Sequence, residues 1–412
     1  MSNMLITNIG QLVNVRDESP LLRGGDLALL PVTENAWLRV IEGRIAETGS
    51  MEQWQAAAGE TIIDARGGAV LPGWCDSHTH IVFAATREEE FVDKIKGLSY
   101  ADIAAKGGGI LNSARKLRHA TEDELFASAW QRLHKLIHQG TTAIEIKSGY
   151  GLTVADELKM LRVIQRLKQK APIPVKATFL GAHAVPEEYK NNTEGYIRLI
   201  TEEMLPAIAH ENLADYIDVF CENGFFSAAQ TLQVCEAGMR YGLLPKIHAN
   251  QLSLSGGVQA GVKLGAISVD HLETMDEEAI QVLAGSNTIG TLLPTAAFFL
   301  RMAFQPARQL LNAGCAIALA SDYNPGSSPS GNMNLVVAMS CIQMKLLPEE
   351  AINAATINGA HAMQIGHEAG SITVGKLANL IITQPISSLA FLPYSFGDNL
   401  IEKVIVGGEV WE

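Results

Sequence analysis

The stretch 73-GWCDSHTHIVF-83 has the pattern of one short buried strand and carries two histidines, His78 and His80. Because alternate side chains of a strand point to the same face, these two imidazoles lie on one side and can hold one cation together. Further apolar or β-branched runs follow along the chain: TTAIEIK (141–147), VKATFLGAH (175–183), YIDVFCE (216–222), LPKIHAN (244–250), AISVDHLE (266–273), NTIGTLLP (287–294) and CAIALASD (315–322). Together with the first stretch they make eight candidate strands.

Amphipathic segments follow most of these runs. Examples are VADELKMLRVIQRLKQK (154–170) and EGYIRLITEEMLPAIA (194–209). Strands that alternate with helices in this way are typical of parallel sheets, and eight such pairs are what a (β/α)8 barrel requires. We therefore predict an α/β fold with a TIM-type barrel, whose active site lies at the carboxyl ends of the strands.

The two ends of the chain have a different pattern. Residues 1–66 contain short alternating segments separated by turn residues, and similar segments return in SITVGKLANLIITQ (371–384) and KVIVGGEVWE (403–412). We predict that both ends pair into one small β-sandwich domain made of residues 1–66 and 367–412. The barrel then occupies residues 67–366, inserted between the two parts.

Composition and charge exclude several classes of partner. The formal net charge is −13 and no basic run is present, so the chain lacks the positive surface that nucleic-acid binding requires. The N-terminal MSNMLITNIGQLVNV has no secretory pattern, and no segment approaches a membrane span, so we expect a cytoplasmic protein. Five scattered cysteines fit reduced thiols. The low share of charged residues, 18%, suggests broad burial and an oligomer interface, and a homodimer is the expected assembly.

Potential metal ligands also end later runs. His248 closes the fifth run, His271 the sixth and Asp322 the eighth, so all would meet His78 and His80 at the barrel mouth. We predict metal ligation by His78, His80, His248 and Asp322. Imidazoles and a carboxylate suit zinc or iron, divalent or ferric, and ligand identity does not separate the two metals.

The number of metal ions is predicted from the fourth run. Two-metal barrels of this kind commonly carry a bridging carboxylated lysine at the end of the fourth strand. Here that run closes with Cys221 and Glu222, whereas Lys147 closes the second run. We therefore expect one metal ion per chain.

Several motifs resemble a known family. The pattern PGWCDSHTH (72–80), with a later His, His and Asp, resembles the amidohydrolase superfamily. Narrower motifs along nearly the whole chain resemble the imidazolonepropionase family of histidine degradation: FAATREEEF (83–91), GGGI (107–110), GTTAIEIKSGYGL (140–152), FLGAHAVP (179–186), DVFCENGFFS (218–227), HANQLS (248–253) and SDYNPGSSP (321–329). The resemblance implies hydrolysis of the cyclic amide bond of 4-imidazolone-5-propanoate to N-formimino-L-glutamate by a metal-activated water.

The resemblance also implies catalytic residues. Asp322 is expected to accept a proton as well as bind metal, and His271 to orient water or polarise the carbonyl group. Which of the two is the principal base stays open. Gln251 is expected beside the metal, where its amide can orient water but cannot act as a base.

Substrate contacts follow from the same resemblance. Arg87 is expected to bind the propanoate carboxylate through its planar guanidinium, and Tyr150, His183 and Gln251 are expected to contact carboxylate and ring. Tyr100 is a weaker candidate, and the glycines at 107–109 are expected to lie in a loop that covers the substrate. The loop with Asn324, Gly326 and Ser327 is expected to bind the glutamate end of the product, with backbone N–H groups as donors.

Two other functions fit parts of this pattern. A related deaminase would use the same metal and His271, and ammonia release would distinguish it from ring opening. A barrel that had lost catalysis is the other alternative, and the intact set of potential ligands argues against it. Metal analysis of the purified protein tests that alternative.

Overall fold

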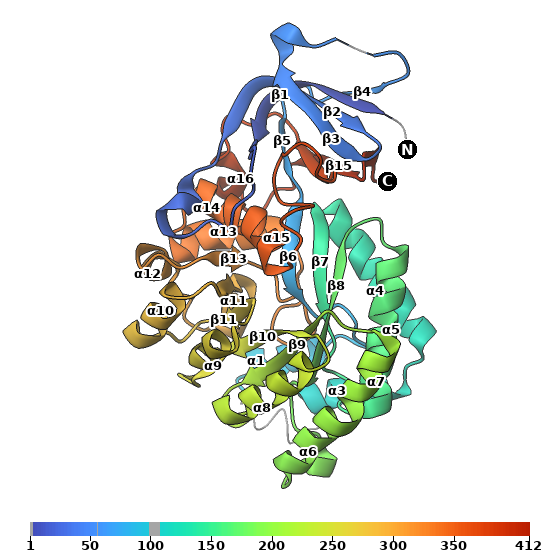
Figure 1. Cartoon of the computed structure of the whole chain (residues 1–412), viewed down its shortest axis with the longest axis vertical. Coiled ribbons are helices and arrows are strands. Elements are labelled where there is room, and N and C mark those ends of the chain that lie inside the picture. Colours follow the sequence, from blue (N-terminus) through green and yellow to red (C-terminus); the bar gives the residue numbers. More distant parts are fainter. Residues whose placement is uncertain (1–2, 56, 99–107) are drawn as a thin grey trace.

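The computed structural model describes residues 3–55, 57–98 and 108–412. They contain two sheets, one at the top of Figure 1 and the other directly below it, surrounded by helices. The larger part is a barrel of eight parallel strands in sequential order. Its strands coincide with the eight predicted runs: β6 (Trp74–Thr79), β7 (Thr141–Lys147), β8 (Val175–Ala182), β9 (Tyr216–Cys221), β10 (Leu244–Ala249), β11 (Ser268–His271), β12 (Ile289–Leu292) and β13 (Ile317–Leu319). The predicted (β/α)8 architecture is confirmed.

The first and last strands close the barrel just beyond the end of β13. The backbone N–H of Asp322 donates to the carbonyl of His78 over 2.9 Å, and the N–H of His80 donates to the carbonyl of Tyr323 over 2.9 Å. Asp76 on β6 reinforces the seam, because its carboxylate accepts bonds from the backbone N–H and the hydroxyl of Ser321. This closure brings His78 and His80 next to Asp322, some 240 positions later in the sequence. The bond between Asp76 and Ser321 spans a similar separation.

Helices pack around the barrel and connect its strands. Their starts follow ordinary capping chemistry: Thr121 and Glu124 form a capping box, and the side chains of Thr153 and Asp276 accept N–H bonds from the first turns that follow them. The helices are α1 (Glu88–Ile95), α3 (Ile110–His119), α4 (Glu122–His138), α5 (Val154–Lys170), α6 (Thr193–Leu199), α7 (Leu205–Glu211), α8 (Ala228–Met239), α9 (Gly257–Leu264), α10 (Glu277–Ala284), α11 (Pro294–Leu300), α12 (Ala307–Asn312), α13 (Met333–Met344), α14 (Pro348–Ala355), α15 (Ile357–Ala362) and α16 (Phe391–Tyr394). A π-helical turn, Ile200–Met204, joins α6 to α7.

Both chain ends build the second sheet, and both termini lie beside it in Figure 1. Strand β5 pairs with β1 from the N-terminal part and with β14 from the C-terminal part, so it joins the two ends and leads directly into β6. The predicted domain built from both ends is confirmed, while its exact boundaries remain a prediction. Its strands are β1 (Met4–Val13), β2 (Val32–Ile41), β3 (Arg44–Ser50), β4 (Thr61–Asp64), β5 (Ala69–Pro72), β14 (Leu380–Thr383), β15 (Ile401–Val406) and β16 (Glu409–Val410).

Apolar side chains fill each part separately. One large core joins the barrel strands to their helices, and a smaller core lies within the chain-end sheet. Four of the five cysteines are buried and all five are free thiols, in agreement with the sequence. Among the described residues, no helix is both long and apolar enough to cross a membrane.

Candidate active site and metal centre

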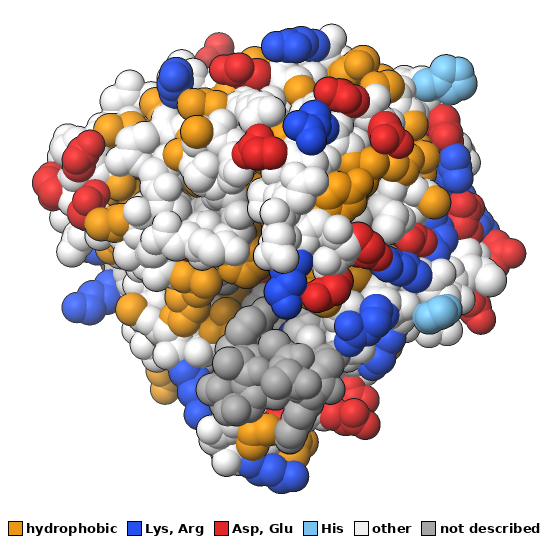
Figure 2. Space-filling model, turned by 90° about the horizontal axis from the view of Figure 1, so that it is seen from below, with side chains coloured by type: hydrophobic (Ala, Val, Ile, Leu, Met, Phe, Trp, Pro, Cys, Tyr) orange, Lys and Arg blue, Asp and Glu red, His pale blue; other side chains and the backbone are white. Residues whose placement is uncertain are grey.

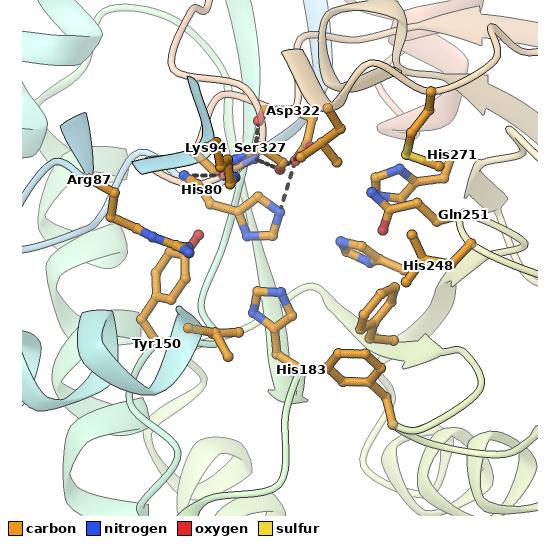
Figure 3. Close-up of a pocket in the computed structure, with 18 residues that line it drawn as sticks. His80, Arg87, Lys94, Tyr150, His183, His248, Gln251, His271, Asp322 and Ser327 are labelled. Carbon is orange, nitrogen blue, oxygen red and sulfur yellow. Dashed lines mark hydrogen bonds and ion pairs between the residues drawn. The ribbon is translucent and has the colours of Figure 1, made fainter. Parts of the chain in front are cut away.

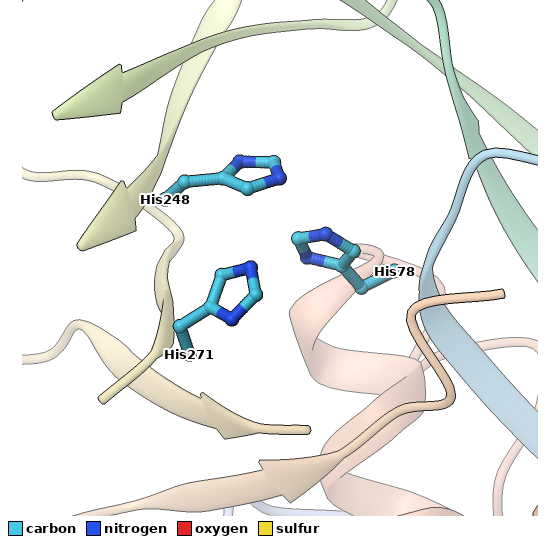
Figure 4. A group of neighbouring side chains, drawn as sticks. All are labelled: His78, His248 and His271. Atoms are coloured by element: carbon cyan, nitrogen blue, oxygen red, sulfur yellow. The ribbon is translucent and has the colours of Figure 1, made fainter. Parts of the chain in front are cut away.

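Five side chains predicted to bind or serve a metal ion meet at the carboxyl end of the barrel. None exposes more than 3% of its surface: His78, His80, His248, His271 and Asp322. His78 is central, because its ligand atoms lie within 4.8 Å of those of His248 and His271 in one group, and of His80 and Asp322 in another. Figure 4 shows His78 facing the two later histidines. The structure thus brings all the predicted ligands together, and the choice of four among them remains a prediction.

Two buried carboxylates form hydrogen bonds with the Nδ1 atoms of His78 and His248. Oδ2 of Asp270 lies 2.6 Å from Nδ1 of His78, and Oδ2 of Asp218 lies 2.9 Å from Nδ1 of His248. Each carboxylate accepts the Nδ1–H bond, which leaves Nε2 of each ring with a free lone pair. Burial lowers the pKa of both imidazoles well below the usual range, and Lys147 and the neighbouring rings lower it further. Both rings are therefore neutral, as metal ligands must be.

Lys147 supports both of these carboxylates. Its ammonium lies 2.8 Å from Oδ2 of Asp218 and 3.7 Å from Oδ2 of Asp270, and it also contacts Glu145 over 2.6 Å. Burial alone would lower the pKa of Lys147, but the three carboxylates outweigh burial and raise it, so the side chain is a cation. Lys147 is fully buried behind the histidines and serves as a support for the site.

His80 and Asp322 complete the cluster. Nε2 of His80 lies 3.3 Å from Nε2 of His78 and 3.4 Å from Oδ1 of Asp322. Burial would raise the pKa of Asp322, but the bond to His80 and the neighbouring imidazoles lower it, so the carboxylate is ionised. At this distance the lone pairs on Nε2 of His78 and Nε2 of His80 would repel each other unless a proton or a cation lies between them. Several imidazole nitrogens beside a carboxylate oxygen therefore fit a metal ion of the zinc or iron type.

His271 differs from the other histidines of the site. Its backbone has φ 87°, a rare conformation for a residue with a side chain, at the end of β11. Nδ1 lies 3.3 Å from Oε1 of the buried Glu273. Burial would lower the pKa of His271, but the charge of Glu273 and its hydrogen bond outweigh burial and raise it. This imidazole is therefore the one suited to hold and release a proton.

A cavity of about 590 Å³ opens beside these residues. Figure 3 shows Arg87 and Tyr150 on one side, with His248, Gln251 and His271 on the other. All the predicted substrate contacts that the structure describes line it: Arg87, Tyr150, His183, Gln251, Asn324, Gly326 and Ser327. Tyr100 and Gly107 lie outside the described residues.

The end of the molecule seen in Figure 2 carries apolar patches interspersed with side chains of both charges.

Arg87 enters the cavity from the start of α1. Its Nε and Nη2 both donate to Oε2 of Glu90, over 2.8 and 2.6 Å. Oε1 of Glu90 accepts the N–H of Gly109, which ties α1 to the start of α3. A Cβ atom on Gly326 would lie 2.2 Å from Nη1 of Arg87. Glycine at position 326 therefore makes room for the guanidinium.

A loop after β7 holds Tyr150 in place. The carboxylate of Glu157 on α5 accepts the backbone N–H groups of Gly149, Gly151 and Leu152 over 2.8–3.2 Å. The carbonyl of Gly149 lies 3.1 Å from Nδ1 of His183, which fixes this imidazole at the end of β8. Burial raises the pKa of Tyr150, so its hydroxyl stays protonated and can donate.

The loop from Asn324 to Ser327 differs from its prediction in one respect. Oδ1 of Asn324 accepts the N–H groups of both Gly326 and Ser327 over 2.8 Å. These backbone donors are therefore occupied inside the loop, and the expectation that they are available to a product was wrong for this arrangement. The hydroxyl of Ser327 remains at the cavity, 3.3 Å from Oδ2 of Asp322.

Gln251 follows β10 and exposes 8% of its surface. Its loop is fixed by Glu222, whose Oε2 accepts the N–H groups of Leu252 and Ser253 over 2.8 and 3.3 Å. Glu222 directly follows β9, so the end of β9 stabilises the loop that follows β10. This arrangement keeps the amide of Gln251 beside the cluster of histidines.

Sequence reasoning did not identify several residues of the site. Asp218, Asp270 and Glu273 lie within or directly after strands, where polar side chains are rare unless they serve a site, and this signal could have identified them. Lys94 lies seven residues after Arg87, a spacing that places both on one face of a helix. The apolar lining carried no such signal: Ile110, Phe220, Phe225, Leu252, Leu300 and Met302.

Comparison with known proteins supports the same reading. The profile of the amidohydrolase family matches residues 69–411. An imidazolonepropionase from Flavobacterium johnsoniae is 54% identical over 98% of this chain and 99% of its own length. Imidazolonepropionases from Christiangramia forsetii and Clostridium tetani are 52% and 44% identical, each over 99% of this chain and over 99% and 98% of their own lengths. The resemblance inferred from the motifs is confirmed.

Solved structures share the fold at low sequence identity. Guanine deaminase of E. coli has a TM-score of 0.74 at 14% identity, covering 100% of this chain and 99% of its own. The 5-methylcytosine deaminase from Klebsiella pneumoniae has a TM-score of 0.74 at 17% identity, covering 99% and 97%. These likenesses concern the barrel architecture, whereas the sequence similarity extends over the full length. The chain belongs to the amidohydrolase family and, within it, to the imidazolonepropionases.

Proposed function

We propose that this chain hydrolyses the cyclic amide bond of 4-imidazolone-5-propanoate and releases N-formimino-L-glutamate, a step of histidine degradation. The observation that carries the proposal is the convergence of the strand-end histidines and Asp322 beside a cavity with a guanidinium, in a chain similar over its full length to imidazolonepropionases. A small anionic ring substrate suits a cavity with a few polar groups and an otherwise apolar lining.

We propose His78, His80, His248 and Asp322 as ligands of one metal ion, zinc or iron. The carboxylates behind His78 and His248 support this choice, because they leave Nε2 of both rings free. A bound ion would lower the pKa of a water ligand toward about 7 and polarise the amide carbonyl. His271 is left outside the ligand set in this assignment.

We assign the proton transfers to His271 and Asp322. The ring nitrogen that leaves needs a proton, and an imidazole with a raised pKa can deliver one. The ionised carboxylate of Asp322 can accept the proton of the attacking water. Gln251 can orient that water through its amide, but it has no basic atom.

Arg87, Tyr150, His183, Asn324, Gly326 and Ser327 are proposed to position the substrate. Among the residues that the structure describes, Glu90 bonds only the Nε and Nη2 side of Arg87, so the Nη1 side can bind the propanoate carboxylate. The hydroxyl groups of Tyr150 and Ser327 can donate to the same carboxylate or to the product. His183 can bond the ring through the nitrogen that Gly149 leaves free.

Freshly generated imidazolonepropanoate tests the proposal. The purified protein should convert it to an acyclic product heavier by one water, identified by mass spectrometry and NMR. His248→Ala and Asp322→Ala should lose bound metal and this activity while the barrel stays folded. Release of ammonia in place of ring opening, or full activity in either variant, would contradict the assignment.

The quaternary state, the cellular location and the domain boundaries are also proposals. We propose a cytoplasmic homodimer. The proposed division at residues 66/67 and 366/367 leaves β5 (Ala69–Pro72) in the barrel part of the sequence, although this strand pairs with the chain-end sheet. Light scattering after gel filtration tests the dimer, and limited proteolysis tests the boundaries.

A further inference from the structure

Lys94 is a second cation at the cavity that the roles above do not use. It lies in the last turn of α1 and lines the cavity together with Arg87. Positions 87, 90 and 94 recur at helical spacing, so Arg87, Glu90 and Lys94 share one face of α1. Phe91 and Ile95 border this face on one side, and both are exposed. The side of α1 that faces the cavity is therefore its charged side.

The charge of Arg87 is already compensated. Two of its nitrogens donate to one carboxylate oxygen of Glu90, and the pair is largely buried. Glu90 is held in turn by the N–H of Gly109, so it is not free to move away from the arginine. This pair brings no net positive charge to the cavity, although an anionic substrate needs one.

Lys94 can supply this charge. Among the described residues, no carboxylate lies within ion-pair distance of its ammonium, which lies 5.8 Å from the centre of the Phe299 ring. Phe91 stacks on Phe299 with ring centroids 5.3 Å apart, so the ammonium has an apolar border. Burial and the charge of Arg87 lower the pKa of Lys94, while Glu90 opposes this shift. A half-buried cation in such surroundings gains stability from an anion.

We propose that Lys94 binds the propanoate carboxylate of the substrate together with Arg87 and determines the preference for an anionic substrate. The inference rests on the proposed function. The protein as a whole carries a net charge of −13 and repels anions, so a local cation at the cavity has to offset that field.

Steady-state kinetics with matched variants test this role. Lys94→Met should raise KM for imidazolonepropanoate about 10-fold with little change in kcat, because the contact is made equally in the bound substrate and the transition state. Lys94→Arg should restore most of the affinity. Lys96→Met is the control, because Lys96 is exposed directly after the same helix and its loss changes the net charge equally. The control should behave like the wild type.

A second substrate and ionic strength complete the design. With the propanoate replaced by a neutral amide, Lys94→Met and wild type should have equal kcat/KM, which also shows that the variant is folded. Added salt should lower kcat/KM of the wild type more than that of Lys94→Met. Equal kinetics of Lys94→Met and Lys96→Met on the anionic substrate overturn the role of Lys94. Failure of the wild type to hydrolyse imidazolonepropanoate overturns the proposed function itself.

Discussion

The ammonium of Lys147 lies 2.8 Å from Oδ2 of Asp218, the same oxygen that lies 2.9 Å from Nδ1 of His248. The same ammonium lies 3.7 Å from Oδ2 of Asp270, which holds Nδ1 of His78. One buried cation on β7 therefore supports the carboxylates behind two imidazoles on β6 and β10. This lysine lies on the wrong strand to bridge metal ions, and its contacts give it a different role.

Lys147→Met should weaken both folding and metal binding. The change leaves Glu145, Asp218 and Asp270 buried, with Lys246 as the remaining ammonium in contact with Glu145. An uncompensated buried charge costs about 3–5 kcal/mol of unfolding free energy. Loss of support behind metal-bound histidines typically lowers metal affinity about 10- to 100-fold. Urea denaturation and competition with a chelator measure the two effects.

Lys190→Met is the matched control, because Lys190 is exposed and its loss changes the net charge equally. Lys190→Met should leave the free energy of unfolding and the metal affinity unchanged. If Lys147→Met binds metal as tightly as the wild type, Asp218 and Asp270 orient the histidines without help from the lysine.

The fold was predictable because its signals are local. Each barrel strand is a short apolar run, and the polar residues that end these runs mark the functional end of the barrel. His78, His80, His248, His271 and Asp322 could be identified in this way. The closure between β6 and β13 follows from the architecture, so the meeting of His78 with Asp322 followed as well.

The remaining part of the site depends on side-chain geometry that a sequence does not display. Asp218 points inward from the middle of β9, but nothing in the run shows that it reaches His248. The backbone donors of Gly326 and Ser327 were expected to be free, and the Asn324 side chain takes them. The glycine at 326 instead accommodates Arg87, a contact between residues 239 positions apart that local patterns do not indicate.

His271→Ala should reduce kcat by roughly 10²- to 10⁴-fold, the contribution of a positioned acid or base. Bound metal should decrease less than in His248→Ala, because His271 lies outside the proposed ligand set. Glu273→Gln should give a smaller loss, since the amide can still bond Nδ1 of His271 but carries no charge. Activity assays and metal analysis of each variant test this order of effects on kcat and on bound metal. Normal turnover of His271→Ala would show that Asp322 and water suffice.

Lys376 should make stability depend on pH in the alkaline range. Its ammonium is buried near Arg16 and Cys75 and donates to Ser19, Ala369 and Ser371, and burial lowers its pKa to about 8. Between about pH 8 and about pH 10.4 the unfolded chain binds a proton that the folded chain lacks, so this group makes the unfolding free energy rise with pH. Below pH 8 its destabilising contribution is fully present.

The difference in unfolding free energy between wild type and Lys376→Met isolates this contribution, because all other groups titrate in both proteins. Urea denaturation at about pH 7.5 and about pH 10 should give a difference that moves in favour of the wild type as pH rises. A difference independent of pH would mean that Lys376 keeps its ordinary pKa in the folded protein.

Gly326→Ala should act on the substrate through Arg87. The new Cβ would lie 2.2 Å from Nη1, so the guanidinium has to move, and it cannot move without weakening its two bonds to Glu90. The backbone of Gly326 is not in the left-handed region, so alanine introduces no strain of its own. We expect a rise in KM for imidazolonepropanoate of about 10-fold with a melting temperature near that of the wild type.

A double-mutant cycle separates this effect from a direct one. Arg87→Met alone should lower kcat/KM about 10- to 150-fold on the anionic substrate, the loss of one charge-assisted contact, and far less on a neutral amide analogue. Because Gly326 has its effect through the guanidinium, adding Gly326→Ala to Arg87→Met should cost nothing more, and methionine at 87 leaves room for the extra methyl group. Losses that add up in the double variant would show that Gly326 touches the substrate itself. Equal losses on both substrates in Arg87→Met would mean that the arginine supports α1 through Glu90, and that the carboxylate is recognised by Tyr150, Ser327 and Lys94.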